Sequence, residues 1–318
     1  MGIDRTRKRK LVLPKWAGEI LCERRGEELW LVCEECGFPP LPDHFNWCEF
    51  EDALGDFYAM PRRTRESSRK LPHVRFASAS DEAGLIEYVK EHGPVLARVV
   101  HVDPLGGPVQ LVQALSVLKA EQKVFSIARE LISQVNELNT FLESTVVEYS
   151  KGVSPLGRKA SVRPNKREAE AIAEIPGLLE DIRLASTAAV HAAEAEGIQN
   201  DCWRSLLKLI AARRSNDSID YLSSAHRCLC HIFNLFPPIL VFNGEKAVEC
   251  PTFHRTGIRP MLYFLLREVY RYKHVIRLCS RDDCGQFFIP GRDNAEYCSD
   301  RCTNMVGQRN LLKRNRTE

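Results

Sequence analysis

Four cysteines near the C-terminus constrain this chain more than any other feature of its sequence. They are spaced C-x4-C-x13-C-x3-C. Two close pairs of thiols separated by a short loop match a tetrahedral structural zinc site, because each pair closes a small chelate loop and the connection folds one pair onto the other. Four protein sulfurs leave no position for water, so we expect a structural Zn²⁺ and no catalytic metal. The expected ligands are Cys279, Cys284, Cys298 and Cys302.

The residues between these cysteines suit a zinc knuckle. Gly285 directly follows the second cysteine, where a tight turn is easier for a residue without a Cβ. Phe287 to Ile289 predict a short strand beside the metal, and Arg292 to Asn294 predict a polar turn. Four reduced thiols without a metal are the alternative. An iron–sulfur cluster would also accept four thiolates, but the spacing differs from the common ferredoxin runs.

The chain after Cys302 is basic and has helical spacing. Residues 302–318 hold four Arg or Lys and one acidic residue, and three of the basic residues recur at i, i+4 and i+7 along one edge of a helix. Such a helix leaving a zinc knuckle suits nucleic acid, whereas a frayed, solvated tail is the alternative. The candidate DNA contacts are Asn304 and Gln308 for base edges, and Arg309, Lys313, Arg314 and Arg316 for phosphates.

This segment resembles the CGNR zinc finger. The resemblance is carried by Arg277-Leu278-Cys279, Cys284-Gly285, Phe287-Phe288, Tyr297-Cys298-Ser299 and Cys302. In that family of bacterial proteins the finger follows a mostly helical ABATE domain, and the proteins are described as stress-related transcription regulators. Here the family's Cys-Gly-Asn-Arg motif reads Cys302-Thr303-Asn304-Met305, so only the cysteine and the asparagine match. The resemblance implies the same four zinc ligands and a DNA-binding finger over residues 277–318.

The sequence and the resemblance together predict a zinc-dependent DNA-binding protein that regulates transcription. The alternative is a zinc-stabilised protein–protein interaction module that does not bind nucleic acid. The two differ in salt dependence, because phosphate contacts weaken steeply as salt rises. We expect no enzyme, since the sequence lacks a phosphate loop, a dinucleotide fingerprint, a nucleophile elbow and the H-E-x-x-H motif. A small-molecule effector could bind between the helices, and no motif indicates its identity.

A second group of potential ligands lies near the N-terminus. Cys33-Glu34-Glu35-Cys36-Gly37 forms a C-x2-C-G knuckle after a predicted strand, and His44 and Cys48 follow. Cys33, Cys36, His44 and Cys48 could complete a second zinc site. Reduced thiols without a metal are the alternative. The strand before the knuckle is expected in a hairpin that pairs residues 20–22 with residues 29–33.

Helical spacing dominates the middle of the chain. Between Val109 and Tyr149, apolar residues recur at steps of four and three. This stripe is typical of a core-facing bundle helix and is also compatible with a coiled-coil homodimer. Helical signal resumes at Glu168 and runs to Phe236, with an interruption near Pro176-Gly177. The stripe consists of Val124, Ala128, Leu131, Val135, Leu138 and Leu142.

The expected fold is mainly α: a helical bundle with small β-hairpins and a C-terminal zinc-binding hairpin plus helix. One hairpin is predicted around Asn243-Gly244, the favoured type I′ turn pair, and one more helix over residues 261–275. The expected domains are a mixed N-terminal region over 1–74, a helical ABATE-like domain over 75–276, and the finger over 277–318. A basic linker over 150–167 interrupts the helical domain.

Composition excludes several classes of protein. Of the 318 residues, 44% are hydrophobic and 27% are charged, the balance of a chain that buries a sizeable core. No apolar stretch is long enough to span a bilayer, and the basic N-terminus lacks the apolar run of a secretory signal. We therefore expect a cytoplasmic protein with no membrane partner. In that reducing compartment, closely spaced cysteines bind metal more often than they form disulfides.

Overall fold

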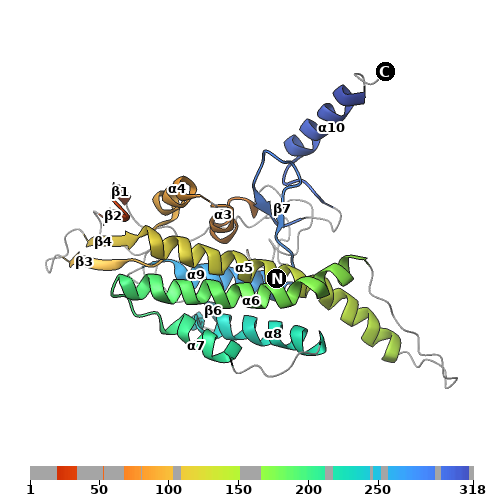
Figure 1. Cartoon of the computed structure of the whole chain (residues 1–318), viewed down its shortest axis with the longest axis horizontal. Coiled ribbons are helices and arrows are strands. Elements are labelled where there is room, and N and C mark those ends of the chain that lie inside the picture. The colour runs from red at the N-terminus through yellow and green to blue at the C-terminus, as the bar shows by residue number, and fades with distance from the viewer. Residues whose placement is uncertain are drawn as a thin grey trace, which may run out of the picture. The chain divides into compact units, whose positions relative to one another are not determined.

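The computed structural model confirms a mainly α protein with small antiparallel β elements (Figure 1). None of the helices within the described part of the chain is long and apolar enough to cross a membrane. The structure describes residues 20–33, 53, 68–79, 81–102, 109–150, 166–211, 218–243, 246–251, 257–290 and 295–314.

Two compact units are each built from separated stretches of the chain. Unit 1 comprises residues 1–119, 236–265 and 277–318, and unit 2 comprises residues 120–235 and 266–276. The C-terminal cysteine segment therefore belongs to the same unit as the N-terminal stretch. The expected division into 1–74, 75–276 and 277–318 stays a prediction.

Unit 1 contains a four-stranded antiparallel sheet with the order β1-β2-β4-β3 (Figure 1). The predicted N-terminal hairpin is confirmed, with Ile20 opposite Cys33 and Arg25 opposite Glu28. The helical interpretation from Val109 onward is wrong for its first six residues, which form the inner strand β4. Gln110 and Gln113 stand three residues apart among apolar neighbours, so the segment lacks the strict alternation of a half-buried strand and its pattern is compatible with a helix. The strands are β1 Ile20–Arg25, β2 Glu28–Cys33, β3 Arg98–Val102 and β4 Val109–Ala114.

Two short helices and a second hairpin complete the upstream part of unit 1. Asp81 caps helix α4, because its side chain accepts a hydrogen bond of 2.7 Å from the Gly84 N–H. The second hairpin is confirmed, but Asn243, expected in its turn, is the last residue of β5 and pairs with Lys246. The intervening residues 244 and 245 lie outside the described residues. The elements are α3 Pro72–Ser78, α4 Glu82–His92, β5 Ile239–Asn243 and β6 Lys246–Cys250.

Unit 2 is helical. Helix α6 packs against both α7 and α8, which also contact each other (Figure 1). The expected interruption at Pro176 is wrong, because α6 continues through it. Buried apolar residues on both sides of the proline continue one stripe, and their packing outweighs the lost backbone hydrogen bond. In α5, the predicted stripe residues from Val124 to Leu138 are buried. The helices are α5 Leu115–Ser150, α6 Lys166–Ala195, α7 Asp201–Ala211 and α8 Ser218–Asn234.

Helix α9, Arg259–Arg271, ends four residues before the predicted boundary. Lys273 adopts a left-handed conformation with φ +54°, and the His274 N–H donates to the Val269 carbonyl at 3.0 Å. This is the hydrogen-bond pattern of a Schellman cap, which usually places glycine where Lys273 lies. Because the sequence has no glycine at this position, it does not indicate where the helix ends.

Polar side chains of α5 hold the residues that follow this cap. The Ser133 hydroxyl accepts a hydrogen bond from the Ile276 N–H at 3.2 Å, and Arg129 Nη1 donates to the Ile276 carbonyl at 3.2 Å. Asn136 Nδ2 donates to the His274 carbonyl at 2.6 Å. The backbone directly before the cysteine segment is therefore fixed by buried hydrogen bonds within unit 2.

The cysteine segment forms a small hairpin followed by a helix, as the sequence predicts. Strand β7, Arg277–Leu278, pairs with β8, Phe287–Phe288, and helix α10 spans Asp300–Arg314. We call residues 277–314 the finger. The predicted turn at Arg292 to Asn294 lies outside the described residues.

Candidate metal centre

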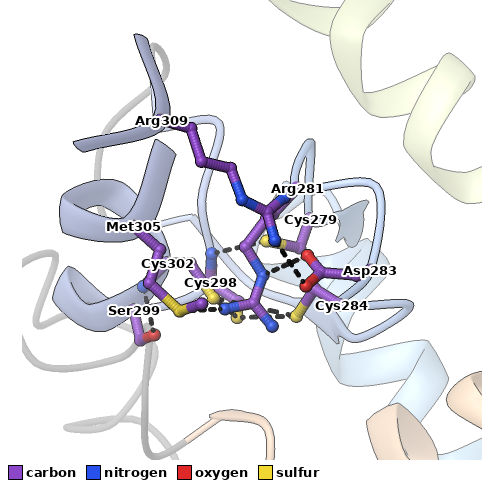
Figure 2. Close-up of polar contacts among 9 residues, drawn as sticks. All are labelled: Cys279, Arg281, Asp283, Cys284, Cys298, Ser299, Cys302, Met305 and Arg309. Carbon is purple, nitrogen blue, oxygen red and sulfur yellow. Dashed lines mark hydrogen bonds and ion pairs between the residues drawn. The ribbon is translucent and has the colours of Figure 1, made fainter. Parts of the chain in front are cut away.

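The finger brings the four C-terminal cysteines together. Their Sγ atoms all lie within 4.8 Å of one another. Three of the Sγ–Sγ distances are 3.6 Å for Cys284–Cys298, 3.5 Å for Cys298–Cys302 and 3.8 Å for Cys284–Cys302 (Figure 2). A tetrahedral ion with metal–sulfur bonds of about 2.3 Å places its sulfurs about 3.8 Å apart. The cluster can therefore hold a metal ion, and these distances are too long for a disulfide.

The chain presents the sulfurs from two knuckles. The first knuckle, residues 279–285, is closed by a hydrogen bond of 2.9 Å from the Cys284 N–H to the Arg281 carbonyl. Gly285 then adopts φ +60°, a left-handed conformation that glycine reaches easily, in the tight turn expected there. The Cys298 N–H donates to Cys279 Sγ at 3.4 Å, which ties the second pair of cysteines to the first.

The second knuckle is the start of helix α10. Ser299 precedes the helix, and its hydroxyl accepts a hydrogen bond of 3.3 Å from the Cys302 N–H (Figure 2). This is an N-cap, and it places Cys302 in the first turn of the helix. A serine directly before a helical run is the sequence signal of such a cap, and this signal could have located the start of α10.

The cluster supplies most of the finger's own core. Cys279, Phe288, Cys298 and Cys302 are buried together, with Cys284, Ala295 and Tyr297 packed against them. A core of this size is too small to stabilise a separate lobe by burial of apolar surface alone. A bound metal would supply the missing free energy, as it does in small metal-binding domains.

The thiols differ in their tendency to ionise. Burial raises the pKa of the Cys298 thiol, and its contacts with Cys302 and Cys284 raise it further. Burial also raises the pKa of Cys284. For Cys302 burial works in the same direction, but hydrogen bonds from Ser299 and the neighbouring thiols outweigh it and lower the pKa to about 7. A cation that binds all four sulfurs must displace protons from them.

A guanidinium lies beside the sulfurs. Arg281 Nε forms an ion pair of 2.9 Å with Asp283 Oδ1, and its Nη1 donates to Met305 Sδ at 2.8 Å (Figure 2). Burial lowers the pKa of Arg281, but negative charge on Cys302 and Asp283 outweighs burial and raises it. Sequence reasoning missed this residue, because nothing in the spacing of the cysteines places Arg281 over them.

Helix α10 turns one face toward the first knuckle. Met305 and Arg309 lie four residues apart on this face, and Arg309 Nη2 donates to Asp283 Oδ2 at 3.1 Å (Figure 2). Two further predicted contact residues, Asn304 and Gln308, are exposed. Lys313 and Arg314 lie in α10 with their side chains outside the described residues, and Arg316 also lies outside them.

The other predicted site lies mostly beyond the described residues. Cys33 ends strand β2, whereas Cys36, His44 and Cys48 fall outside the part of the chain that the structure describes. Within the described residues, the C-terminal cysteines are the one group of three or more His, Cys, Asp or Glu side chains close enough to hold a metal.

Comparison with known proteins adds no relative. No family model, no curated protein and no solved structure matches the chain. The functional assignment therefore rests on the residues of the finger.

Proposed function

We propose that the chain is a zinc-dependent DNA-binding protein that regulates transcription. The observation that carries the proposal is the tetrahedral spacing of four thiols at the point where a basic helix begins. Cys279, Cys284, Cys298 and Cys302 would hold the Zn²⁺. When bound, the ion would supply no reaction chemistry and would fix the helix on the knuckle.

The charge of α10 supports a polyanionic partner. Its residues include Arg301, Arg309, Lys313 and Arg314 against the single acidic Asp300. Arg301 and Arg309 are exposed. The ion pair between Arg309 and Asp283 is also exposed, so it contributes little stability, and a phosphate can compete for the arginine. The regulatory role is what the resemblance to the CGNR finger implies.

Zinc content tests the metal assignment. Elemental analysis of pure protein should give at least one equivalent of zinc, and Cys298→Ser should lose one equivalent because three thiolates and a hydroxyl bind the ion far more weakly. Cys228→Ser, at a buried cysteine of α8, is the matched control and should keep the wild-type content. Iron in place of zinc, or an unchanged content in the finger variant, would contradict the assignment.

Salt dependence tests DNA binding. We compare wild type with a tail variant in which Arg309, Lys313, Arg314 and Arg316 are alanine, using gel shifts on mixed genomic fragments. Four phosphate contacts would reduce wild-type affinity about 100-fold between about 50 and 200 mM salt, and the variant should lose most of this dependence with its zinc intact. The matched control replaces Lys151, Arg158, Lys159 and Arg163 of the basic linker, which removes the same charge elsewhere.

A protein–protein interaction module is the second candidate. Leu278 and Leu311 of the finger are 52% and 60% exposed, and exposed apolar side chains can contact a protein partner. If wild type shifts no fragment at low salt, DNA binding is refuted and this candidate takes its place. If the linker control weakens binding as much as the tail variant does, the finger is not the DNA contact.

A further inference from the structure

One stripe of exposed residues along α10 has its own pattern. Contacts with Arg281 and Asp283 turn Met305 and Arg309 toward the knuckle. At 100° per residue, Gly307 lies opposite these two residues, and it shares a stripe at i, i+3, i+4 and i+7 with three exposed neighbours. We call this stripe the outer face of α10: Asn304, Gly307, Gln308 and Leu311, all exposed.

Gly307 contributes nothing to packing within the described residues. A Cβ at this position would meet nothing within 4 Å. Glycine inside a helix is less stable than alanine, because it loses more backbone freedom when the chain folds. Gly307 therefore lowers the stability of the helix, and no steric need within the described structure requires it. Such a glycine suits a position where another molecule approaches the helix backbone closely.

The neighbours of Gly307 carry groups suited to base edges. Asn and Gln amides can form paired hydrogen bonds with N6 and N7 of adenine in the major groove, and an apolar side chain can contact the methyl group of thymine. Asn304 and Gln308 offer the amides, and Leu311 offers the apolar contact, being 60% exposed. The outer face has no Arg or Lys, the residues that most often read guanine.

Positive charge lies beside this face. Arg301 is exposed, and by its position in the helix it adjoins Gln308. The residues of α10 together carry four basic groups and one acidic group. In protein–DNA complexes, phosphate contacts position a helix and base contacts specify the sequence. An uncharged face on a basic helix suits this division, because the face can meet a base edge while the basic residues beside it meet phosphates.

We infer that the outer face of α10 enters the major groove of duplex DNA and reads A·T base pairs through Asn304, Gln308 and Leu311, with Gly307 allowing close approach of the helix. The inference rests on the proposed function and adds the class of DNA sequence that the finger prefers.

The experiment uses full-length, zinc-loaded protein and two labelled duplexes of equal length, one rich in A·T and one rich in G·C. Wild type should bind the A·T-rich duplex at least tenfold more tightly. Asn304→Ala and Gln308→Ala should each reduce this ratio by about fivefold or more, as expected for loss of one paired base contact. Asn310→Ala is the matched control: it removes an exposed amide that lies about 120° or more around the helix from Asn304 and Gln308, and it should keep the ratio.

Gly307→Ala separates recognition from stability. The alanine should raise the thermal midpoint of the protein by about 2 °C, because alanine favours the helix. The same substitution should weaken binding to the A·T-rich duplex about tenfold, because the methyl group prevents close approach. A merely structural role for Gly307 would move affinity and stability in the same direction or leave affinity unchanged.

The outcomes separate the two proposals. If wild type binds neither duplex at low salt, the proposed function fails. If it binds both duplexes equally with a steep salt dependence, or if Asn304→Ala and Asn310→Ala behave alike, DNA binding stands and the outer face is not the reading face. A preference for the G·C-rich duplex would also overturn the inference.

Discussion

Single charged residues determine how the finger can hold a metal. A divalent cation bound by four thiolates leaves a net charge of two negative units at a partly buried centre. Arg281 lies beside the sulfurs, and Arg69 acts electrostatically on Cys298 from outside the finger. Positive charge placed there lowers the free energy of the thiolate form and partly offsets burial, which raises the pKa of Cys284 and Cys298.

A buried histidine makes stability depend on pH. His73 in α3 is fully buried, neither ring nitrogen has a hydrogen-bond partner in the described structure, and burial lowers its pKa from 6.5 to about 3. The unfolded chain therefore takes up the proton first as pH falls. The stabilising effect of the neutral imidazole is complete above pH 6.5 and is lost as pH falls toward 3.

We predict that His73→Leu makes the protein less sensitive to acid. Between about pH 6 and pH 4, wild type should lose about 1.4 kcal/mol per pH unit relative to the variant. Denaturant unfolding at a series of pH values measures this difference, and any contribution of the metal site cancels because both proteins contain it. His191→Leu, at an exposed position of α6, is the control and should follow wild type. Parallel curves for wild type and His73→Leu would refute the prediction.

At the scale of elements, two serines join the finger to the rest of unit 1. Strand β8 pairs with β7 along one edge, and the N–H groups of Phe287 and Ile289 on the other edge donate to Ser78 Oγ at 3.2 Å and Ser68 Oγ at 3.0 Å. An unpaired N–H at a buried strand edge is costly. The hairpin is therefore anchored by side chains near α3 as well as by the cysteines.

Ser68→Ala should destabilise the finger by about 1–3 kcal/mol, because the buried Ile289 N–H loses its acceptor. Zinc affinity should fall in parallel, since metal binding and folding of the finger are coupled. Competition with a chromophoric chelator measures the affinity. Ser280→Ala, at an exposed position of the first knuckle, is the control and should bind zinc as wild type does. Equal affinities for Ser68→Ala and wild type would show that the serine does not support the site.

The sequence indicated the site better than it indicated the elements around it. The cysteine spacing and Gly285 correctly predicted the cluster and a tight turn beside it, because both depend on residues close in the chain. The strand β4, the continuation of α6 through Pro176 and the Lys273 cap were missed. Each of these depends on packing or pairing with distant residues, which override local preference. Arg281 was missed for the same reason.

At the scale of the whole molecule, the finger is not an isolated appendage. Its residues belong to unit 1 together with the N-terminal sheet, and unit 2 holds the backbone at residues 274–276 directly before it. If the finger binds DNA as proposed, that binding depends on the metal that fixes its helix on the knuckle.

The most direct test of this account measures DNA affinity while zinc is removed and restored in the full-length protein. Chelation should reduce binding of mixed-sequence DNA to the level of the Cys298→Ser variant, and one equivalent of Zn²⁺ per chain should restore it. The variant should not respond to added zinc, because it lacks one of the four ligands. DNA affinity that is unchanged by removal of the metal, or absent in the zinc-loaded protein at low salt, would contradict the account.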